Sequence, residues 1–156
     1  KAWPTNYFRT LIENLVQDDF NVILISSRNK KDLHICSEIS HHIKSKNVFN
    51  FAGKTSFPEL SFLLSNVDLL ITNDSAPMHI GASHNIPLIA IFGSTTRELG
   101  FYPYSSNSKI IEVSLDCRPC GLHGKKKCPL KHFKCMKLIT PQMIYEEARK
   151  LLDKKF

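Results

Sequence analysis

The chain has 156 residues, of which 42% are hydrophobic and 22% charged, a balance typical of a folded globular domain. No apolar run approaches the roughly 20 residues of a membrane-spanning helix, and no segment has the composition of a disordered or repetitive chain. The net charge of +7 favours anionic partners such as nucleotides, phosphorylated glycans, nucleic acid or an acidic membrane surface, although a solvated lysine-rich surface would carry the same charge.

Helices and short strands are predicted to alternate along the chain from the spacing of apolar residues. The predicted helices cover residues 4–19, 33–43, 56–64, 76–85 and 140–154, and the predicted strands cover residues 21–26, 48–53, 67–72, 87–93 and 109–114. Ser56 is expected to cap the third helix, with Glu59 completing a capping box. This alternation indicates βαβ units with right-handed crossovers. We therefore expect an α/β, Rossmann-like fold: a parallel sheet with helices on both faces, in a single domain over residues 1–156.

Polar residues follow the third predicted strand at its carboxyl end, where open parallel sheets bind ligands. Ser75, with Asp74 as the alternative, is expected to cap the helix that begins at Ala76. The free amides of that first turn and the positive end of the helix dipole are suited to a phosphate. His79 lies four residues after Ser75, so both side chains are on one helix face.

A second polar turn, Gly93-Ser94-Thr95-Thr96, ends the next predicted strand. Gly93 permits a tight turn, and three hydroxyls with backbone amides could form a second concavity for an oxyanion. Helix capping and an ordinary turn would explain either loop alone. Their occurrence at successive strand ends, with His79 on the inward face, indicates a site that holds one diphosphate.

Four stretches of the sequence carry a resemblance to a known family. The stretch TNDSAPMHIGASHNIPLIAIFGSTT (72–96) resembles the D-S/T-G-x-x-H-x-A-A…P…A-L-F-G-P-T signature of the bacterial lipopolysaccharide heptosyltransferases, glycosyltransferase family 9. KAWP (1–4) is similar to the family's K-x-W-P, and FAGKTSFPELSFLLSNVDLLITND (51–74) to its L-A-G-K-T-S-L-x-E-L…A-D-L-L-V-T-N-D. CRPCGLHGKKKCPLKHFKCM (117–136) is similar to a cysteine-containing tail of many members. Ala76 stands where the family has Gly, and Ser94 where it often has Pro.

The resemblance implies the C-terminal half of a GT-B glycosyltransferase, a Rossmann-like domain that binds ADP-heptose or a related nucleotide sugar. The acceptor domain and the catalytic base would lie outside this sequence, so the chain alone would bind donor and transfer little. The acceptor would be the lipopolysaccharide inner core, and the setting the cytoplasm at the inner face of the inner membrane. No nucleic-acid partner is expected. No Asp-x-Asp pair is present, as expected of a transferase that requires no metal cofactor.

The resemblance also implies roles for individual residues. Lys1 would contact the diphosphate, and Lys1 and His79 would be the catalytic residues. Met78 would lie near the adenine or ribose, and Asp32 is the nearest candidate for a carboxylate that binds the ribose. The implied donor-binding residues are Lys1, Asp32, Asp74, Ser75, Ala76, Met78, His79, Gly93, Ser94 and Thr95.

A basic, cysteine-rich loop is predicted at residues 116–137. Its cysteines, Cys117, Cys120, Cys128 and Cys135, could hold a structural zinc ion, although the last spacing is longer than usual. Reduced thiols that pack as small apolar groups, or disulfides, are the alternatives, and the odd total of five cysteines favours a reducing compartment.

The lysines of this loop support a different function for the whole chain. The alternative is a zinc-stabilised module that binds nucleic acid or an anionic membrane through the loop. A dinucleotide oxidoreductase is disfavoured, because no G-x-G-x-x-G follows the first predicted strand.

Overall fold

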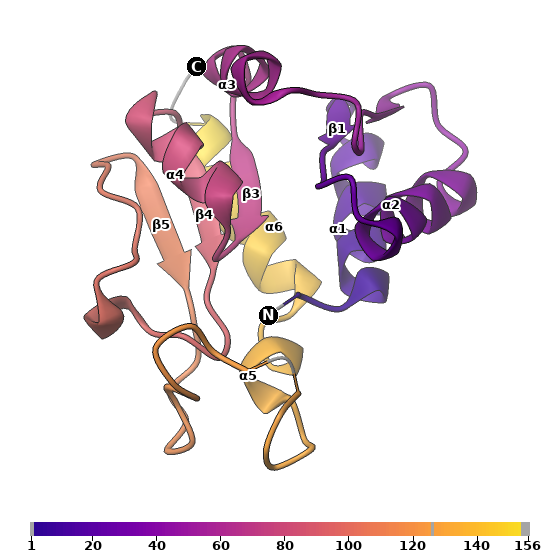
Figure 1. Ribbon diagram of the computed structural model, residues 1–156. Helices are drawn as coiled ribbons and strands as arrows, with labels where there is room; N and C mark the ends of the chain where they lie inside the picture. Colours follow the sequence, from indigo (N-terminus) through magenta and orange to yellow (C-terminus); the bar gives the residue numbers. More distant parts are fainter. Residues whose placement is uncertain (1, 126, 154–156) are drawn as a thin grey trace. The chain divides into compact units, whose positions relative to one another are not determined.

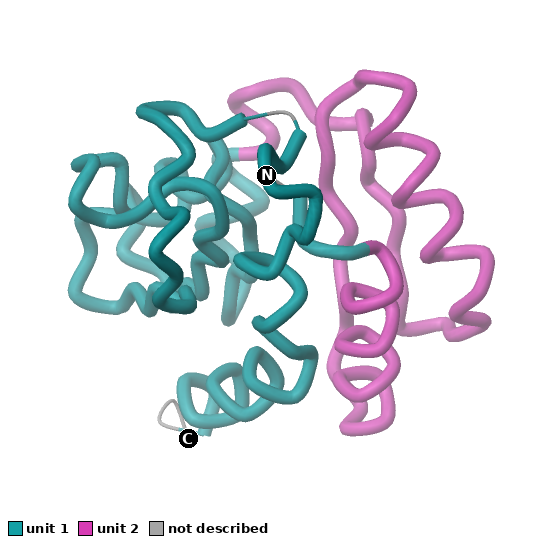
Figure 2. Tube along the Cα trace, turned by 90° about the horizontal axis from the view of Figure 1, so that it is seen from below, with its two compact units in different colours: residues 1–4, 61–156 teal, residues 5–60 magenta. Residues whose placement is uncertain are grey.

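The computed structural model describes residues 2–125 and 127–153 (Figure 1). The chain divides into two compact units: unit 1 comprises residues 1–4 and 61–156, and unit 2 comprises residues 5–60 (Figure 2). Each unit has its own sheet, and every strand pair in the described residues is parallel. The predicted α/β class is confirmed, but the strands form two hydrogen-bonded sheets where one was expected.

Unit 2 contains two helices and a two-stranded sheet. Its elements are α1 (Thr5–Gln17), β1 (Val22–Leu24), α2 (Lys30–His42) and β2 (Val48–Asn50). Ile12 of α1 packs with Ile39 and Ile43 of the α2 region in a buried cluster, as the apolar spacing of these helices predicts. The next helix, α3 (Phe57–Ser65), continues into unit 1.

Unit 1 is built on a sheet with the strand order β3-β4-β5. Its elements are β3 (Leu70–Asn73), α4 (Ala76–Ser83), β4 (Leu88–Ile91), the 3₁₀-helix η1 (Arg97–Leu99), β5 (Ser108–Ile111), α5 (Lys134–Lys137) and α6 (Pro141–Asp153). All four residues of β4 are 0% exposed, the pattern of a central parallel strand covered on both faces. Helices α4 and α6 both contact this strand. The short helices η1 and α5 were not predicted, because three or four residues show no helical periodicity.

The start of the chain is tied to the carboxyl end of β3. Trp3 is 2% exposed, and its indole N–H donates to the carbonyl of Ile139 at 2.8 Å. Its backbone N–H donates to the side-chain oxygen of Asn73 at 3.0 Å. The segment before α1 therefore lies next to the strand end at which the sequence predicts a site.

The predicted capping box of α3 is confirmed in one of its two bonds. The backbone N–H of Ser56 donates to the Glu59 carboxylate at 2.7 Å, as expected. The Ser56 hydroxyl also donates to this carboxylate, at 2.6 Å, instead of accepting a helix N–H. Both bonds favour the charged form, and they hold the pKa of Glu59 below its usual value.

None of the helices in the described residues combines the length and the apolar character needed to cross a bilayer.

Candidate functional site

The loops that follow β3 and β4 are held together at the carboxyl ends of these strands. Asn73 lies opposite Ile91 in the parallel register, and the backbone N–H of Asp74 donates to the carbonyl of Ile91 at 3.3 Å. The Asp74 carboxylate accepts a hydrogen bond from the Thr95 hydroxyl at 2.6 Å. Two turns separated by about twenty residues in the sequence are thus joined by a charge-assisted bond.

Ser75 occupies the N-cap position of α4, as predicted, but its side chain caps no helix N–H. Its hydroxyl donates to the carbonyl of Asn73 at 3.1 Å and lies 3.0 Å from the hydroxyl of Thr72. The start of α4 therefore lacks the side-chain oxygen that normally accepts from its first turn. Ser75, Ala76 and His79 are exposed, so this uncapped helix start faces solvent and suits an anion.

Gly93 is required for a reason other than the predicted one. Its backbone is outside the left-handed region, so the turn does not depend on the conformational freedom of glycine. A Cβ atom at this position would lie 2.5 Å from Cε of Met136, which is 1% exposed. Glycine is needed here because the start of this loop packs directly against Met136.

Of the hydroxyls in this loop, Ser94 differs from its neighbours. The Thr95 hydroxyl donates to the Asp74 carboxylate. The pKa of Glu98 is lowered mainly by a hydrogen bond from its backbone N–H, and to a smaller extent by one from the Thr96 hydroxyl. Ser94 is 6% exposed, and its hydroxyl has no hydrogen-bond partner in the described part of the chain. A buried polar group without a partner costs about 1–3 kcal/mol, so the Ser94 hydroxyl is a candidate to bind a ligand.

Arg118 holds this loop from the cysteine-rich segment, a role that sequence analysis missed. Its guanidinium is 4% exposed and forms an ion pair with Glu112 at 2.8 Å. It also donates to backbone carbonyls, including that of Thr95 at 2.7 Å and that of Gly93. The sequence held one signal for this role: Arg118 is the only arginine in a segment whose other basic residues are lysines and histidines. A planar guanidinium can donate to several carbonyls at once, which a lysine ammonium does less well.

The remaining predicted donor-site residues are Lys1, Met78 and Asp32. Lys1 is outside the described residues, two positions before Trp3. Met78 is 0% exposed, so its side chain belongs to the core and offers no surface to a nucleotide in this structure. Asp32 lies in unit 2, where its carboxylate accepts from the hydroxyl of Ser27 at 2.8 Å and the side-chain amide of Asn29 at 2.6 Å.

The cysteines are free thiols, so the structure contains no disulfide among them. Cys117, Cys120 and Cys128 line one cavity of about 460 Å³. A backbone N–H donated by Phe133 lowers the pKa of Cys128, whereas burial raises that of Cys135. Among the described residues, no group of three or more His, Cys, Asp or Glu side chains is placed to hold a metal ion. A structural zinc at these cysteines stays a prediction.

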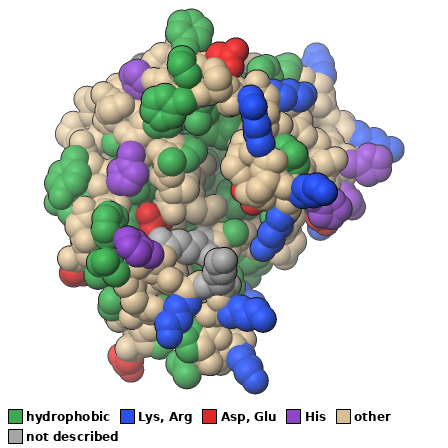
Figure 3. Space-filling view, in the orientation of Figure 1, with side chains coloured by type: hydrophobic (Ala, Val, Ile, Leu, Met, Phe, Trp, Pro, Cys, Tyr) green, Lys and Arg blue, Asp and Glu red, His purple; other side chains and the backbone are tan. Residues whose placement is uncertain are grey.

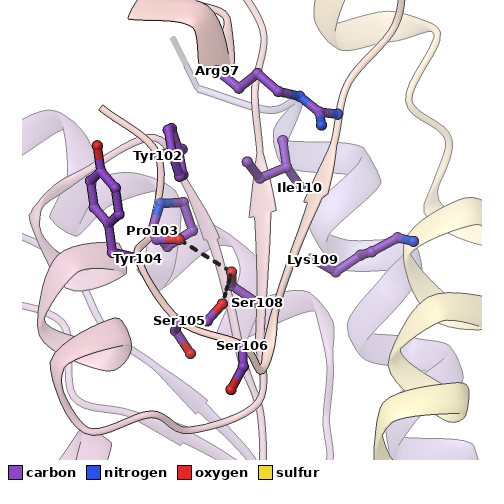
Figure 4. Close-up of a pocket in the computed structure, with 9 residues that line it drawn as sticks. All are labelled: Arg97, Tyr102, Pro103, Tyr104, Ser105, Ser106, Ser108, Lys109 and Ile110. Atoms are coloured by element: carbon purple, nitrogen blue, oxygen red, sulfur yellow. Dashed lines mark hydrogen bonds between the residues drawn. The ribbon is translucent and has the colours of Figure 1, made fainter. Parts of the chain in front are cut away.

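A second cavity, of about 540 Å³, lies beside β5 (Figure 4). Tyr102 and Tyr104 form one side of it, with ring centroids 4.5 Å apart, and Arg97 and Lys109 contribute cations. Ser108 shapes its wall by donating to the carbonyl of Ser105 at 2.7 Å. None of the residues at the uncapped start of α4 lines this cavity, so it is separate from the candidate site.

Known proteins resemble this chain over most of its length. The model of the family described as glycosyltransferase family 9 (heptosyltransferase) matches residues 1–134. Lipooligosaccharide heptosyltransferase 2 of Campylobacter jejuni subsp. jejuni serotype O:2 is 37% identical over 154 residues, which cover 97% of this chain and 47% of that protein. Lipopolysaccharide heptosyltransferase 3 of Escherichia coli is 38% identical over 107 residues, which cover 69% of this chain and 31% of that protein.

Solved structures share the fold. The E. coli ADP-heptose lipopolysaccharide heptosyltransferase II superposes with a TM-score of 0.80 at 25% identity, over 99% of this chain and 43% of that one. The E. coli heptosyltransferase WaaC with ADP-2-deoxy-2-fluoro heptose has a TM-score of 0.70 at 15% identity, over 96% of this chain and 39% of that one, and supports the fold alone. The chain spans less than half the length of these relatives. Because the family match extends over most of its residues, this chain belongs to glycosyltransferase family 9, the heptosyltransferases.

Proposed function

We propose that this chain is the donor-binding part of a glycosyltransferase that transfers a heptose from ADP-heptose, or a related nucleotide sugar, to a lipopolysaccharide or lipooligosaccharide inner core. The matched relatives are named as heptosyltransferases of these glycolipids, and one solved relative is described as an ADP-heptose enzyme. The observation that carries the proposal is the bond from Thr95 to Asp74, which joins both strand-end loops beside the uncapped start of α4.

The diphosphate of the donor is proposed to bind between these loops. The first-turn amides of α4 face it with the positive end of the helix dipole, and His79 reaches it from the same exposed face. Ser94 offers its unpartnered hydroxyl from the second loop. Lys1 would add a cation from the segment that Trp3 anchors at Asn73.

The same groups would assist the reaction by stabilising the leaving group. Displacement at the anomeric carbon transfers negative charge to the departing diphosphate, and donors fixed in advance lower the barrier to that step. The acceptor hydroxyl must also lose its proton to a general base. Asp74 is engaged by Thr95, so we assign it to positioning the loops and place the base outside this sequence. The chain alone is therefore expected to bind donor and to transfer little sugar.

Calorimetric titration of the 156-residue chain with ADP tests this proposal. His79→Ala should weaken ADP binding about tenfold, the loss expected for one charge-assisted contact to phosphate. The matched control is His84→Ala, at the other end of α4, where the ring contacts the hydroxyl of Ser61 at 2.8 Å. The control should bind ADP as the wild type does. Equal binding by all three proteins would remove His79 from the site, and no binding by the wild type would reject the site.

The alternative of a zinc-stabilised binding module does not describe the whole chain, because the family match runs through residues 1–134. A structural zinc at Cys117, Cys120, Cys128 and Cys135 can accompany the proposed function. Elemental analysis of protein purified without chelator would reveal it as about one zinc per chain, in the manner of a four-cysteine site. Rapid reaction of all four thiols with a thiol reagent, with no metal released, would contradict it.

A further inference from the structure

The segment from Cys117 to Tyr145 contains no acidic residue. Its described lysines are all exposed: Lys125, Lys127, Lys131, Lys134 and Lys137. Arg118 is not part of this charge, because its guanidinium is buried against Glu112. The positive charge that this segment presents to solvent therefore comes from lysines, whose long stems allow their ammonium groups to move.

Leucines are exposed among these lysines. Leu122 is 55% exposed, Leu130 61% and Leu138 50%. Leu130 and Lys125 line the same cavity, so an apolar and a cationic side chain are neighbours here. Figure 3 shows hydrophobic side chains and side chains of Lys or Arg close together at the lower end of the view, over this loop and α5. We call the set the lysine–leucine surface, and it consists of Leu122, Lys125, Lys127, Leu130, Lys131, Lys134 and Leu138.

The segment that bears this surface is fixed to the core at both ends. On one side, Arg118 donates to the carbonyl of Thr95 at 2.7 Å, and the backbone N–H of Cys120 donates to the carbonyl of Ser94 at 2.8 Å. On the other side, Cys135 and Met136 are 5% and 1% exposed. A loop held in this way loses less conformational entropy when it binds a partner than a free loop would.

We propose that the lysine–leucine surface docks on an anionic phospholipid bilayer. Lysines near such a surface are attracted to its negative lipids, and leucines can enter the boundary between head groups and acyl chains. Reversible membrane attachment becomes stable when two such signals act together. This surface has both, because its lysines lie between its exposed leucines along one short segment.

The leucines favour a bilayer over nucleic acid as the partner. Single-stranded nucleic acid is bound by aromatic side chains on which bases stack, and duplexes by hydrogen bonds to phosphates and base edges. The only Phe, Tyr or Trp between residues 117 and 138 is Phe133, and it is half-buried. Exposed leucines gain little from a sugar–phosphate backbone, whereas they lose contact with water when they enter lipid.

Flotation of the chain with vesicles under reducing conditions tests the proposal. The vesicles contain phosphatidylcholine alone or with about one third phosphatidylglycerol, so that only the second kind is anionic. The lysine variant carries Lys125→Ser, Lys127→Ser, Lys131→Ser and Lys134→Ser, and the leucine variant carries Leu122→Ser and Leu130→Ser. A charge control removes the same number of exposed lysines in unit 2, through Lys30→Ser, Lys31→Ser, Lys44→Ser and Lys46→Ser. An apolar control is Phe62→Ser, at a phenylalanine of α3 that is 74% exposed.

The wild type should bind the anionic vesicles, and added salt should weaken this binding. The lysine variant should lose more than about a hundredfold in affinity, and the leucine variant about tenfold or more. Both controls should stay close to the wild type. Equal losses in the lysine variant and the charge control would overturn the proposal, because net charge alone would then explain binding. A leucine variant that binds as the wild type does would also overturn it, and binding to single-stranded DNA in place of vesicles would assign the surface to nucleic acid.

The proposal is independent of the donor site, because the two share no residue. Calorimetric titration with ADP should therefore give wild-type affinity in the lysine and leucine variants, which also shows that they fold.

Discussion

The turns that open α2 and α4 contain the same kinds of residues and use them differently. Before α2, the side chain of Asn29 accepts the backbone N–H of Asp32 at 2.9 Å, and the Asp32 carboxylate accepts from Ser27 and Asn29. The polar groups of this turn thus serve its own helix. Before α4, the Ser75 side chain caps no N–H, and Asp74 binds across to Thr95 on the next loop.

This difference shows which polar turn is a candidate site. Ser, Asn and Asp after a strand are common because they cap helices, so their presence alone does not predict a ligand. A turn whose helix start stays uncapped, beside a buried hydroxyl without a described partner at Ser94, has polar groups left for one.

The largest effect is expected from the residue that holds the second loop from outside. Arg118→Met should lower the free energy of unfolding by about 3–5 kcal/mol, because it leaves Glu112 and several carbonyls without their buried donor. Arg9→Met is the control, at an exposed ion pair with Glu13 at 3.9 Å, and should cost about 1 kcal/mol or less. Urea unfolding measures both. Similar costs for the two variants would mean that Arg118 does not hold the loop.

The next effect separates the two turns by function. Thr95→Val removes the hydroxyl that binds Asp74, and should cost about 1.5–3 kcal/mol of stability and weaken ADP binding. Asn29→Ala removes the cap of α2, and should cost about 1 kcal/mol and leave ADP binding unchanged. Urea unfolding and calorimetric titration of both variants provide the comparison. If Asn29→Ala lost ADP binding and Thr95→Val bound ADP as the wild type does, our assignment of the two turns would be reversed.

A smaller effect is expected from substitution of Ser94, which should weaken ADP binding without lowering the free energy of unfolding. Its buried hydroxyl has no partner in the described chain, so Ser94→Ala should leave the free energy of unfolding unchanged or raise it by about 1 kcal/mol. The same variant should weaken ADP binding about fivefold, the equivalent of one neutral hydrogen bond. Thermal unfolding and calorimetry would test this pair of outcomes. A destabilised variant with normal ADP binding would identify the hydroxyl as a structural group.

The smallest effect is expected at the start of α3, where the polar side chains hydrogen-bond to each other. Two hydrogen bonds from Ser56 hold the pKa of Glu59 below its usual value, so the ionised carboxylate stabilises the fold. This contribution is complete above the pKa of the unfolded chain and disappears as the pH falls through the folded pKa. Ser56→Ala should raise the pKa of Glu59, measured by NMR titration, since one of the two bonds is lost. An unchanged pKa would show that the hydroxyl does not contribute.

Much of the fold follows from local patterns. The apolar spacing of α1 and α2 predicts these helices, Thr140 and Pro141 predict the start of α6, and the apolar run at residues 87–93 predicts the strand β4. The two short helices, η1 and α5, show no such pattern, since their length allows none. The division into two sheets was also missed, because hydrophobic runs show where strands form and not which of them pair.

The sequence predicted where in the chain the candidate site lies, but not which side chains contact one another there. Asp74, Ser75 and His79 were assigned from one motif, and the structure puts the first two where this loop meets the next. Sequence reasoning did not predict that Arg118 would organise the second loop, since the two are distant in the chain. For Met78 it predicted a position near the adenine or ribose, and the structure shows only that this side chain is 0% exposed.

The order of helices and strands, the positions of the polar turns and the family itself can be derived from the amino-acid sequence, because each depends on neighbouring residues. The partner of each polar side chain cannot, because it depends on segments brought together by packing. Ser75 and Asn29 each precede a helix, yet the side chain of Ser75 binds the end of its own strand and that of Asn29 caps its helix. Gly93 likewise suggests a tight turn in the sequence, whereas in the fold it allows Met136, from a distant segment, to pack against it.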